Sequence, residues 1–207
     1  MDFTKAIKEY YDREIRVIES LNLEEISEAM NAIYDAYQKG GTIYVCGNGG
    51  SAATASHMQN DFSRGVSEKL DKKFNFYCLN DNYPTVMAIA NDIGYEEVFR
   101  HQLINRLKEN DLFIGISGSG NSMNVVNAAQ YAKECGIKVL GITGYKGGKL
   151  KELADYKMHV PEEDMQIDED IHMTFDHMMM KIFYNFLVMN ELTGDNLVDK
   201  PKTLSKK

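Results

Sequence analysis

Residues 112–122 read LFIGISGSGNS, an apolar run followed at once by a loop of hydroxyl residues and glycines. The run is typical of a buried strand, and the residues that follow the loop show helical spacing of apolar positions. Three hydroxyls, on Ser117, Ser119 and Ser122, stand with two glycines at this strand-to-helix junction. Small residues there allow backbone N–H groups to approach an anion, so the loop suits one phosphate group.

A second loop of this kind, CGNGGSA at 46–52, follows the strand-like run at 42–46 and opens a helix. It also matches GxGxxA, a dinucleotide-binding fingerprint. The acid that would hold the ribose is missing at the required distance, because Asp81 lies well past it. A dehydrogenase is therefore the least favoured function. Either loop alone could be a tight turn with a serine cap, but two loops after two parallel strands favour a ligand site.

Working outward from these loops, strand-like runs alternate with helical segments along the chain. This alternation indicates a parallel sheet with helices on both faces. We expect a three-layer α/β sandwich with a five-stranded parallel sheet and additional N-terminal helices over residues 1–40. We further expect one domain over residues 1–195 that ends with a helix at 169–191, and a polar tail over 196–207. The five expected strands cover 42–46, 74–79, 112–116, 138–142 and 156–160.

Composition limits the classes of function. A formal net charge of -8 argues against a broad nucleic-acid surface, although local N–H groups can still bind an anion. The sequence holds no run of about 18 apolar residues, so no membrane span is expected. Cys46, Cys78 and Cys135 are widely spaced and odd in number, which predicts buried small residues in a reducing compartment. We expect a cytoplasmic protein.

Two groups of acidic and histidine residues are candidates for chemistry. His57 and Asp61 are four residues apart on one predicted helix face, just after the first loop. This spacing suits two metal ligands or an acid–base pair, but also an ordinary surface pair worth a few tenths of a kcal/mol. The second group, EDIHMTFDH at 169–177, could likewise be an acidic first turn of a helix with ordinary polar residues.

Four segments together resemble the sugar isomerase (SIS) domain, and within it the phosphoheptose isomerases. They are CGNGGSA, IANDIGYEEVF, GISGSGNSMNV and ITGYKGG. The resemblance extends over nearly the whole chain. It implies a homotetramer with active sites shared between subunits. It also implies an aldose–ketose isomerase that converts sedoheptulose 7-phosphate to glycero-manno-heptose 7-phosphate through an enediolate.

The resemblance also assigns substrate contacts. The phosphate loop of the family corresponds to residues 117–122, where this chain has Gly118 in place of the usual threonine. Positions of the first loop and of the IANDIGY segment contact the substrate in the family. The expected substrate-binding residues are Asn48, Gly49, Gly50, Ser51, Asp92, Ser117, Gly118, Ser119 and Ser122.

Zinc-dependent phosphoheptose isomerases carry their metal ligands at the positions of His57, Asp61, Glu169 and His177. By the same resemblance, the carboxylate of Asp61 is the catalytic base and His177 the acid, and the carboxylate of Glu169 is a second candidate base in this chain. Asp61 replaces the family's glutamate and Glu169 replaces its glutamine. On an unbroken helix Glu169 and His177 would lie about 12 Å apart, so a shared metal needs inward-leaning side chains or ligands from different subunits.

Two other functions remain open on this sequence. One is a non-catalytic SIS protein that binds sugar phosphates or a protein partner; the presence of His57, Asp61 and His177 together favours catalysis instead. The other is isomerisation of a different sugar phosphate, which the changes at Asp61 and Glu169 allow. An assay against pentose, hexose and heptose phosphates separates these alternatives.

Overall fold

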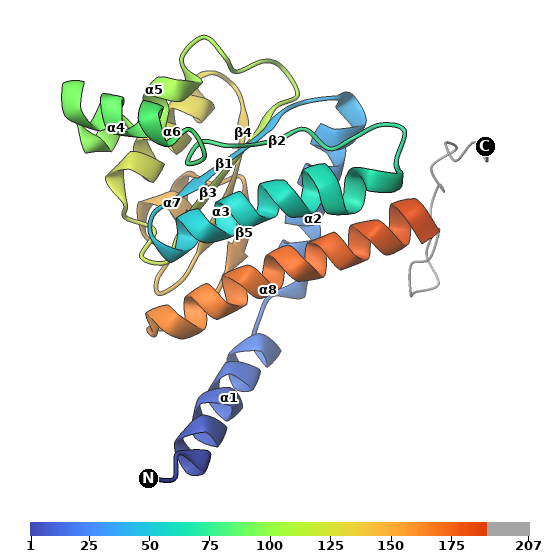
Figure 1. Cartoon of the computed structure of the whole chain (residues 1–207), viewed down its shortest axis with the longest axis vertical. Helices are drawn as coiled ribbons and strands as arrows, with labels where there is room; N and C mark the ends of the chain where they lie inside the picture. The colour runs from blue at the N-terminus through green and yellow to red at the C-terminus, as the bar shows by residue number, and fades with distance from the viewer. Residues whose placement is uncertain (190–207) are drawn as a thin grey trace.

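Five parallel strands form one sheet in the computed structural model, which describes residues 1–189 (Figure 1). Their order in the sheet is β2-β1-β3-β4-β5, and all neighbouring pairs are parallel. The expected α/β fold with five parallel strands is confirmed. The strands are β1 Ile43–Gly47, β2 Phe76–Cys78, β3 Leu112–Ser117, β4 Lys138–Thr143 and β5 Tyr156–His159.

Helices cover both faces of this sheet and form two separate hydrophobic cores. Successive strand residues point to opposite faces, so Val45 belongs to one core and Cys46 to the other. The first face is covered by α2 (Leu23–Lys39), α3 (Gly50–Asn60) and α8 (Met165–Tyr184). The second is covered by α4 (Tyr83–Asp92), α5 (Arg100–Leu103), α6 (Met123–Glu134) and α7 (Gly148–Leu153).

Helix α1 (Thr4–Glu19) projects away from these layers (Figure 1). Arg13 joins it to the segment before α8, with ion pairs of 2.6 Å to Glu162 and 2.9 Å to Asp164. The Tyr10 hydroxyl donates a 2.6 Å hydrogen bond to the Asp170 carboxylate. Val17 alone of the α1 residues is buried, so most of the apolar side chains of this helix are exposed.

Helix α8 begins earlier than the sequence pattern predicts. The expected start at Glu169 is wrong, because the Asp164 side chain caps the helix by accepting a hydrogen bond from the Gln166 amide. A π-helical turn over Asn185–Met189 follows α8. The expected helix end at residue 191 and the tail at 196–207 lie outside the described residues. A single domain over residues 1–195 stays a prediction.

The connection between β1 and β3 determines where ligands can bind. In the sheet, β1 and β3 are neighbours. After β1 the chain continues to β2 on one side of this pair, and after β3 it continues to β4 on the other side. Such a switch in strand order opens a crevice at the carboxyl ends of the strands. Both glycine loops lie there, because one follows β1 and the other follows β3.

The three cysteines differ in their burial. Cys46 and Cys78 are buried as expected, but Cys135 is exposed. The expectation that Cys135 is buried is wrong, because this residue caps the C-terminus of α6, where the chain turns at Gly136.

None of the helices at residues 1–189 is both long and apolar enough to cross a membrane. A cytoplasmic location stays a prediction.

Candidate active site

A pocket of about 220 Å³ lies at the carboxyl ends of β1 and β3. The first loop contributes two of its lining residues and the second loop contributes four. The segment after β4 and the first turns of α8 complete it. The principal lining residues are Asn48, Ser51, Ser117, Gly118, Ser119, Ser122, Tyr145, Met165 and Glu169.

The first loop places the start of α3 beside this pocket. Gly49 has a φ of 55°, a left-handed conformation that glycine adopts at little cost. Helix α3 starts at the next residue, and no side chain caps its N-terminus. The uncapped end of the helix and the buried Ser51 therefore border the pocket with backbone N–H groups and the positive end of the helix dipole.

The second loop folds back on itself through its own hydroxyl groups. The Ser117 hydroxyl donates a hydrogen bond of 3.1 Å to the Ser122 hydroxyl, and the backbone N–H of Asn121 donates one of 3.2 Å to the Ser119 hydroxyl. Gly120 has a φ of 65°, and a Cβ atom at this position would collide with the Gly147 carbonyl. The loop is thus held in one conformation, with its serines toward the pocket.

A pair of asparagines joins the first loop to the start of α6, which follows the second loop. The Asn48 and Asn124 amides exchange two hydrogen bonds of 2.9 Å each, and the Tyr95 hydroxyl donates to Asn48 Oδ1 at 2.8 Å. Asn124 and Tyr95 were not among the residues expected from the sequence, although both lie in the segments that carry the resemblance. Asp92 does not line the pocket. It is exposed at the end of α4, and its carboxylate accepts a hydrogen bond from Asn91.

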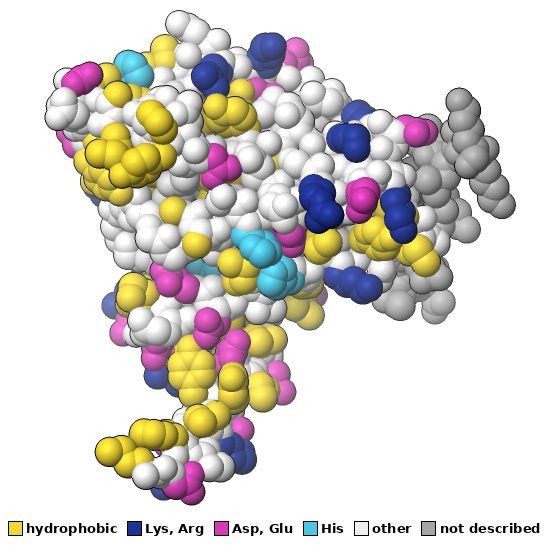
Figure 2. Space-filling model, in the orientation of Figure 1, with side chains coloured by type: hydrophobic (Ala, Val, Ile, Leu, Met, Phe, Trp, Pro, Cys, Tyr) yellow, Lys and Arg dark blue, Asp and Glu magenta, His cyan; other side chains and the backbone are white. Residues whose placement is uncertain are grey.

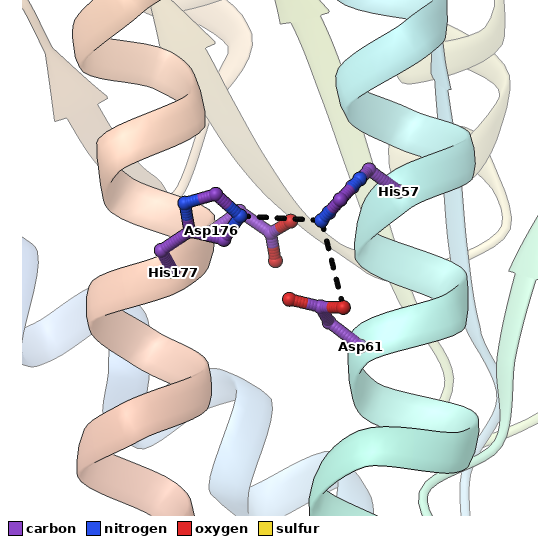
Figure 3. Close-up of side chains that lie close together, drawn as sticks. All are labelled: His57, Asp61, Asp176 and His177. Carbon is purple, nitrogen blue, oxygen red and sulfur yellow. Dashed lines mark hydrogen bonds and ion pairs between the residues drawn. The ribbon is translucent and has the colours of Figure 1, made fainter.

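A second group of polar side chains lies between α3 and α8, which run side by side (Figures 1 and 3). His57 Nε2 lies 3.2 Å from His177 Nε2 and 3.6 Å from Asp61 Oδ1. Asp176 joins them, and one ligand atom from each of the four residues lies within 4.8 Å of every other. The two imidazoles are exposed, whereas the two carboxylates are buried.

The backbone changes conformation at this group. Helix α3 ends at Asn60, and a π-helical turn continues the chain from Asp61 to Val66. Such turns are frequent at functional sites because they rotate a side chain out of the regular helical register. Here the irregular turn starts at one of the four grouped residues.

One face of α8 carries an unusual column of buried polar residues. Asp168, His172 and Asp176 are four residues apart and fully buried, and their side chains have no hydrogen-bond partner among the described residues. Burial raises the pKa of Asp168 to about 7, and burial together with the nearby Asp61 carboxylate raises that of Asp176 to about 7. Burial lowers the pKa of His172 to about 4. Burial thus favours the uncharged form of each of the three side chains.

Within the described protomer, Glu169 does not join His57, Asp61 and His177. Its carboxylate packs against Gly50 at the start of α3 and lines the loop pocket. Asp176 takes the fourth position in the group instead. Asp176 lies in the second acidic and histidine segment, but the sequence pattern assigns it no role, because its neighbour His177 carries the resemblance and spacing alone does not orient a helix.

Several known proteins are similar to this chain in sequence and in fold. The SIS domain family matches residues 7–144. The phosphoheptose isomerase of Aliarcobacter butzleri is 37% identical over 172 residues, which cover 83% of this chain and 90% of that relative.

Two solved structures have the same fold over nearly their whole length. The phosphoheptose isomerase of Neisseria gonorrhoeae aligns with a TM-score of 0.80 and 28% identity, covering 88% of this chain and 98% of that one. A phosphoheptose isomerase of Francisella tularensis aligns with a TM-score of 0.81 and 26% identity, covering 89% and 100%.

Proposed function

Because this chain belongs to the SIS domain family and, within it, to the phosphoheptose isomerases, we propose that it isomerises sedoheptulose 7-phosphate to glycero-manno-heptose 7-phosphate. The observation that carries the proposal is the placement of α3. This helix begins at the loop pocket, carries His57 about two turns later, and ends just before Asp61. One rigid element thus connects a phosphate site to a group of acids and bases.

The loop pocket is the proposed phosphate site. Hydroxyls of Ser51, Ser117, Ser119 and Ser122 border it, together with the uncapped start of α3. These groups donate hydrogen bonds to phosphate oxygens, and the helix dipole favours the negative charge. The two hydrogen bonds between the Asn48 and Asn124 side chains keep the two loops at a fixed separation while the anion binds.

The separation of the two sites suits a long sugar chain. Ser51 and His57 are six residues apart on α3, which corresponds to about 9 Å along the helix axis. In sedoheptulose 7-phosphate seven bonds separate C2 from phosphorus, a zigzag span of roughly 9 Å for bonds of about 1.5 Å. A phosphate in the loop pocket therefore allows the carbonyl end of an extended heptose to reach His57.

The chemistry moves a proton between C1 and C2 and needs a base and an acid. Asp61 and Glu169 are the two candidate bases, the first beside His57 and the second in the loop pocket. A carboxylate takes the C1 proton, and the resulting enediolate accepts a proton at C2. His177, exposed and in contact with His57, moves protons between the two sugar oxygens.

The histidine–aspartate group fits a divalent metal, and we propose zinc. Four ligands at 2.0–2.2 Å from a tetrahedral ion lie about 3.3–3.6 Å from one another. The distances of 3.2 Å and 3.6 Å around His57 Nε2 are close to this range. Imidazole and carboxylate are also ligands that zinc accepts. When bound, the metal would polarise the sugar carbonyl and stabilise negative charge on oxygen.

The assembly we propose is a homotetramer with shared active sites. Helix α1 and its N-cap residue Phe3 expose an apolar stripe at every fourth residue, with Phe3 62%, Ile7 54%, Tyr11 58% and Ile15 53% exposed. Hydrophobic side chains are visible on the surface of this projecting helix (Figure 2). A second copy of the chain would bury them, and Arg13 fixes the helix close to the residues that begin α8.

An assay of the purified protein against pentose, hexose and heptose phosphates tests the proposed function. We expect conversion of sedoheptulose 7-phosphate with a kcat/KM at least about 100-fold higher than for five- or six-carbon substrates. Turnover of a shorter substrate alone would keep the isomerase chemistry but overturn the heptose assignment. Absence of turnover with every substrate, in a preparation that binds the same phosphates, would favour a non-catalytic SIS protein.

A further inference from the structure

Tyr145 stands in an unusual backbone conformation at the wall of the loop pocket, on the connection from β4 to α7. We propose that it is a substrate-binding residue whose hydroxyl donates a hydrogen bond to the phosphate group of the sugar phosphate. The proposal rests on the proposed function for the class of ligand, but phosphate binding alone is enough to test it. The sequence pattern assigns this residue no role.

The backbone of Tyr145 is strained. Its φ is 48°, in the left-handed region, where a residue with a bulky side chain is rare. The other non-glycine residues with positive φ within residues 1–189 are Asn105 and Asn110. Asparagine adopts this conformation more readily, because its short polar side chain can form local hydrogen bonds. Strain of this kind persists only where the surrounding structure enforces it, and it is concentrated at ligand-binding and catalytic sites.

Contacts on both sides of Tyr145 enforce its conformation. Its backbone N–H donates a 3.0 Å hydrogen bond to the Glu162 carbonyl. The N–H of the preceding residue, Gly144, donates one of 2.8 Å to the Gly118 carbonyl in the second loop. The fully buried Asp168 carboxylate occupies the space where a Cβ atom of Gly144 would stand. Because these contacts involve backbone groups or a buried side chain, a second copy of the chain can add groups to the pocket without replacing them.

The hydroxyl end of the Tyr145 ring lies beside the second loop. A Cβ atom at Gly118 would be 3.9 Å from Tyr145 Cε2, the ring carbon next to the one that carries the hydroxyl. Gly118 has no side chain, and serines flank it on both sides, so this ring edge lies next to the hydroxyl groups of the loop. The Tyr95 hydroxyl donates to Asn48, whereas the Tyr145 hydroxyl has no hydrogen-bond partner among the described residues.

A phosphate group in the pocket would supply the missing partner. A phenol hydroxyl donates hydrogen bonds, and a bond to a charged phosphate oxygen is stronger than one between neutral groups. The second loop and the start of α3 border the pocket from two sides, and Tyr145 adds a donor from a third segment. Because its backbone is already held in place, little freedom is lost when the anion binds.

Removal of the hydroxyl alone tests the proposal, since Tyr145→Phe keeps the ring and the backbone. Calorimetric titration with sedoheptulose 7-phosphate and with a pentose phosphate should show at least about 10-fold weaker binding of both, because the phosphate is the part that they share. For the turned-over substrate, KM should rise by a similar factor and kcat should stay within about 3-fold of wild type. Tyr131→Phe, on α6 and outside the pocket, is the matched control and should bind like wild type.

A second variant, Tyr145→Gly, tests whether the strain serves binding. Glycine adopts a φ of 48° at little cost, so the thermal midpoint of this variant should be no lower than that of wild type. Its affinity for both sugar phosphates should nevertheless fall at least as far as that of Tyr145→Phe. Equal affinities of Tyr145→Phe and wild type, a lower midpoint of Tyr145→Gly, or no binding of either phosphate by wild type would each overturn the proposal.

Isomerase activity of the same wild-type preparation separates this inference from the proposed function. Turnover of sedoheptulose 7-phosphate, combined with unchanged phosphate binding by Tyr145→Phe, would overturn the role of Tyr145 and leave the function standing. Phosphate binding that depends on the Tyr145 hydroxyl, in a wild-type protein without isomerase activity, would support the role of Tyr145 and overturn the function.

Discussion

His57 Nε2 on α3 lies 3.2 Å from His177 Nε2 on α8. Two ring nitrogens at this distance need a proton or a cation between them, because facing lone pairs repel. The contact joins two helices that both border the loop pocket. The imidazoles therefore act as one unit, and removing either leaves the other without its partner.

Replacement of His177 by alanine should reduce kcat/KM for the heptose phosphate by at least about 100-fold, since proton transfer by a positioned side chain contributes 10²–10⁴-fold. His57→Ala should have a loss of similar size. The exposed His101, remote from the pocket in sequence and outside the group, provides the control. Full activity in His177→Ala would exclude the whole histidine–aspartate group from the chemistry.

A negative charge in the second loop should strongly weaken phosphate binding. Ser119→Asp places a carboxylate where the phosphate is expected, and repulsion at close range should weaken substrate binding about 100-fold. Ser119→Asn has almost the same shape without the charge and should lose much less. Calorimetric titration with the sugar phosphate measures both. Equal affinities of Ser119→Asp and wild type would show that the phosphate binds elsewhere.

The buried Asp168 predicts an unusual pH dependence of stability. Its pKa in the folded protein, about 7, lies above the ordinary value of 3.8. The contribution of the Asp168 carboxyl to the free energy of unfolding is thus fully present below about pH 4, and it is lost as the pH rises to 7. Asp168→Asn avoids that loss, so its stability advantage over wild type should grow between pH 4 and 8, by up to about 4 kcal/mol.

Urea unfolding of both proteins with chelator present, at several pH values, measures this difference. His172 titrates with the opposite sign, because its pKa is lowered to about 4, but it is present in both proteins and cancels to first order. A difference in unfolding free energy that does not change with pH would contradict the burial of an ionisable Asp168.

The apolar stripe on α1 should hold the oligomer together. Ile7→Asp introduces a charge into the stripe and should shift the tetramer to smaller species at micromolar concentration, as measured by light scattering. Lys5→Asp introduces the same side chain at an exposed, charged position of the helix and should leave the assembly intact. A wild-type monomer in this experiment would contradict shared active sites.

The sequence was sufficient to predict the sheet and the two loops. Each strand is a short apolar run that ends near glycine or polar residues, and parallel strands bring their carboxyl ends to one edge. The start of α8 was missed because the acidic segment around Asp164 hides a capping aspartate. Propensity alone does not distinguish such a cap from an acidic loop.

The detail of the site depended on packing that spacing does not reveal. Ile167, Ile171, Phe175 and Met179 are all buried in the core and set the rotation of α8 against α3. That rotation turns Asp176 toward His57 and leaves Glu169 at the pocket. The loop serines were predictable from their strand-to-helix positions, but the Asn48–Asn124 pair required the relative position of two loops far apart in sequence.

Deuterium incorporation during turnover tests the central claim most directly. The purified protein is incubated with sedoheptulose 7-phosphate in D₂O, and the products are followed by proton NMR. Isomerisation through an enediolate predicts an aldose heptose 7-phosphate that carries deuterium at C2, and no such product with His177→Ala. Unchanged sedoheptulose 7-phosphate without any deuterium, in a preparation that binds it, would contradict the claim that this chain is a phosphoheptose isomerase.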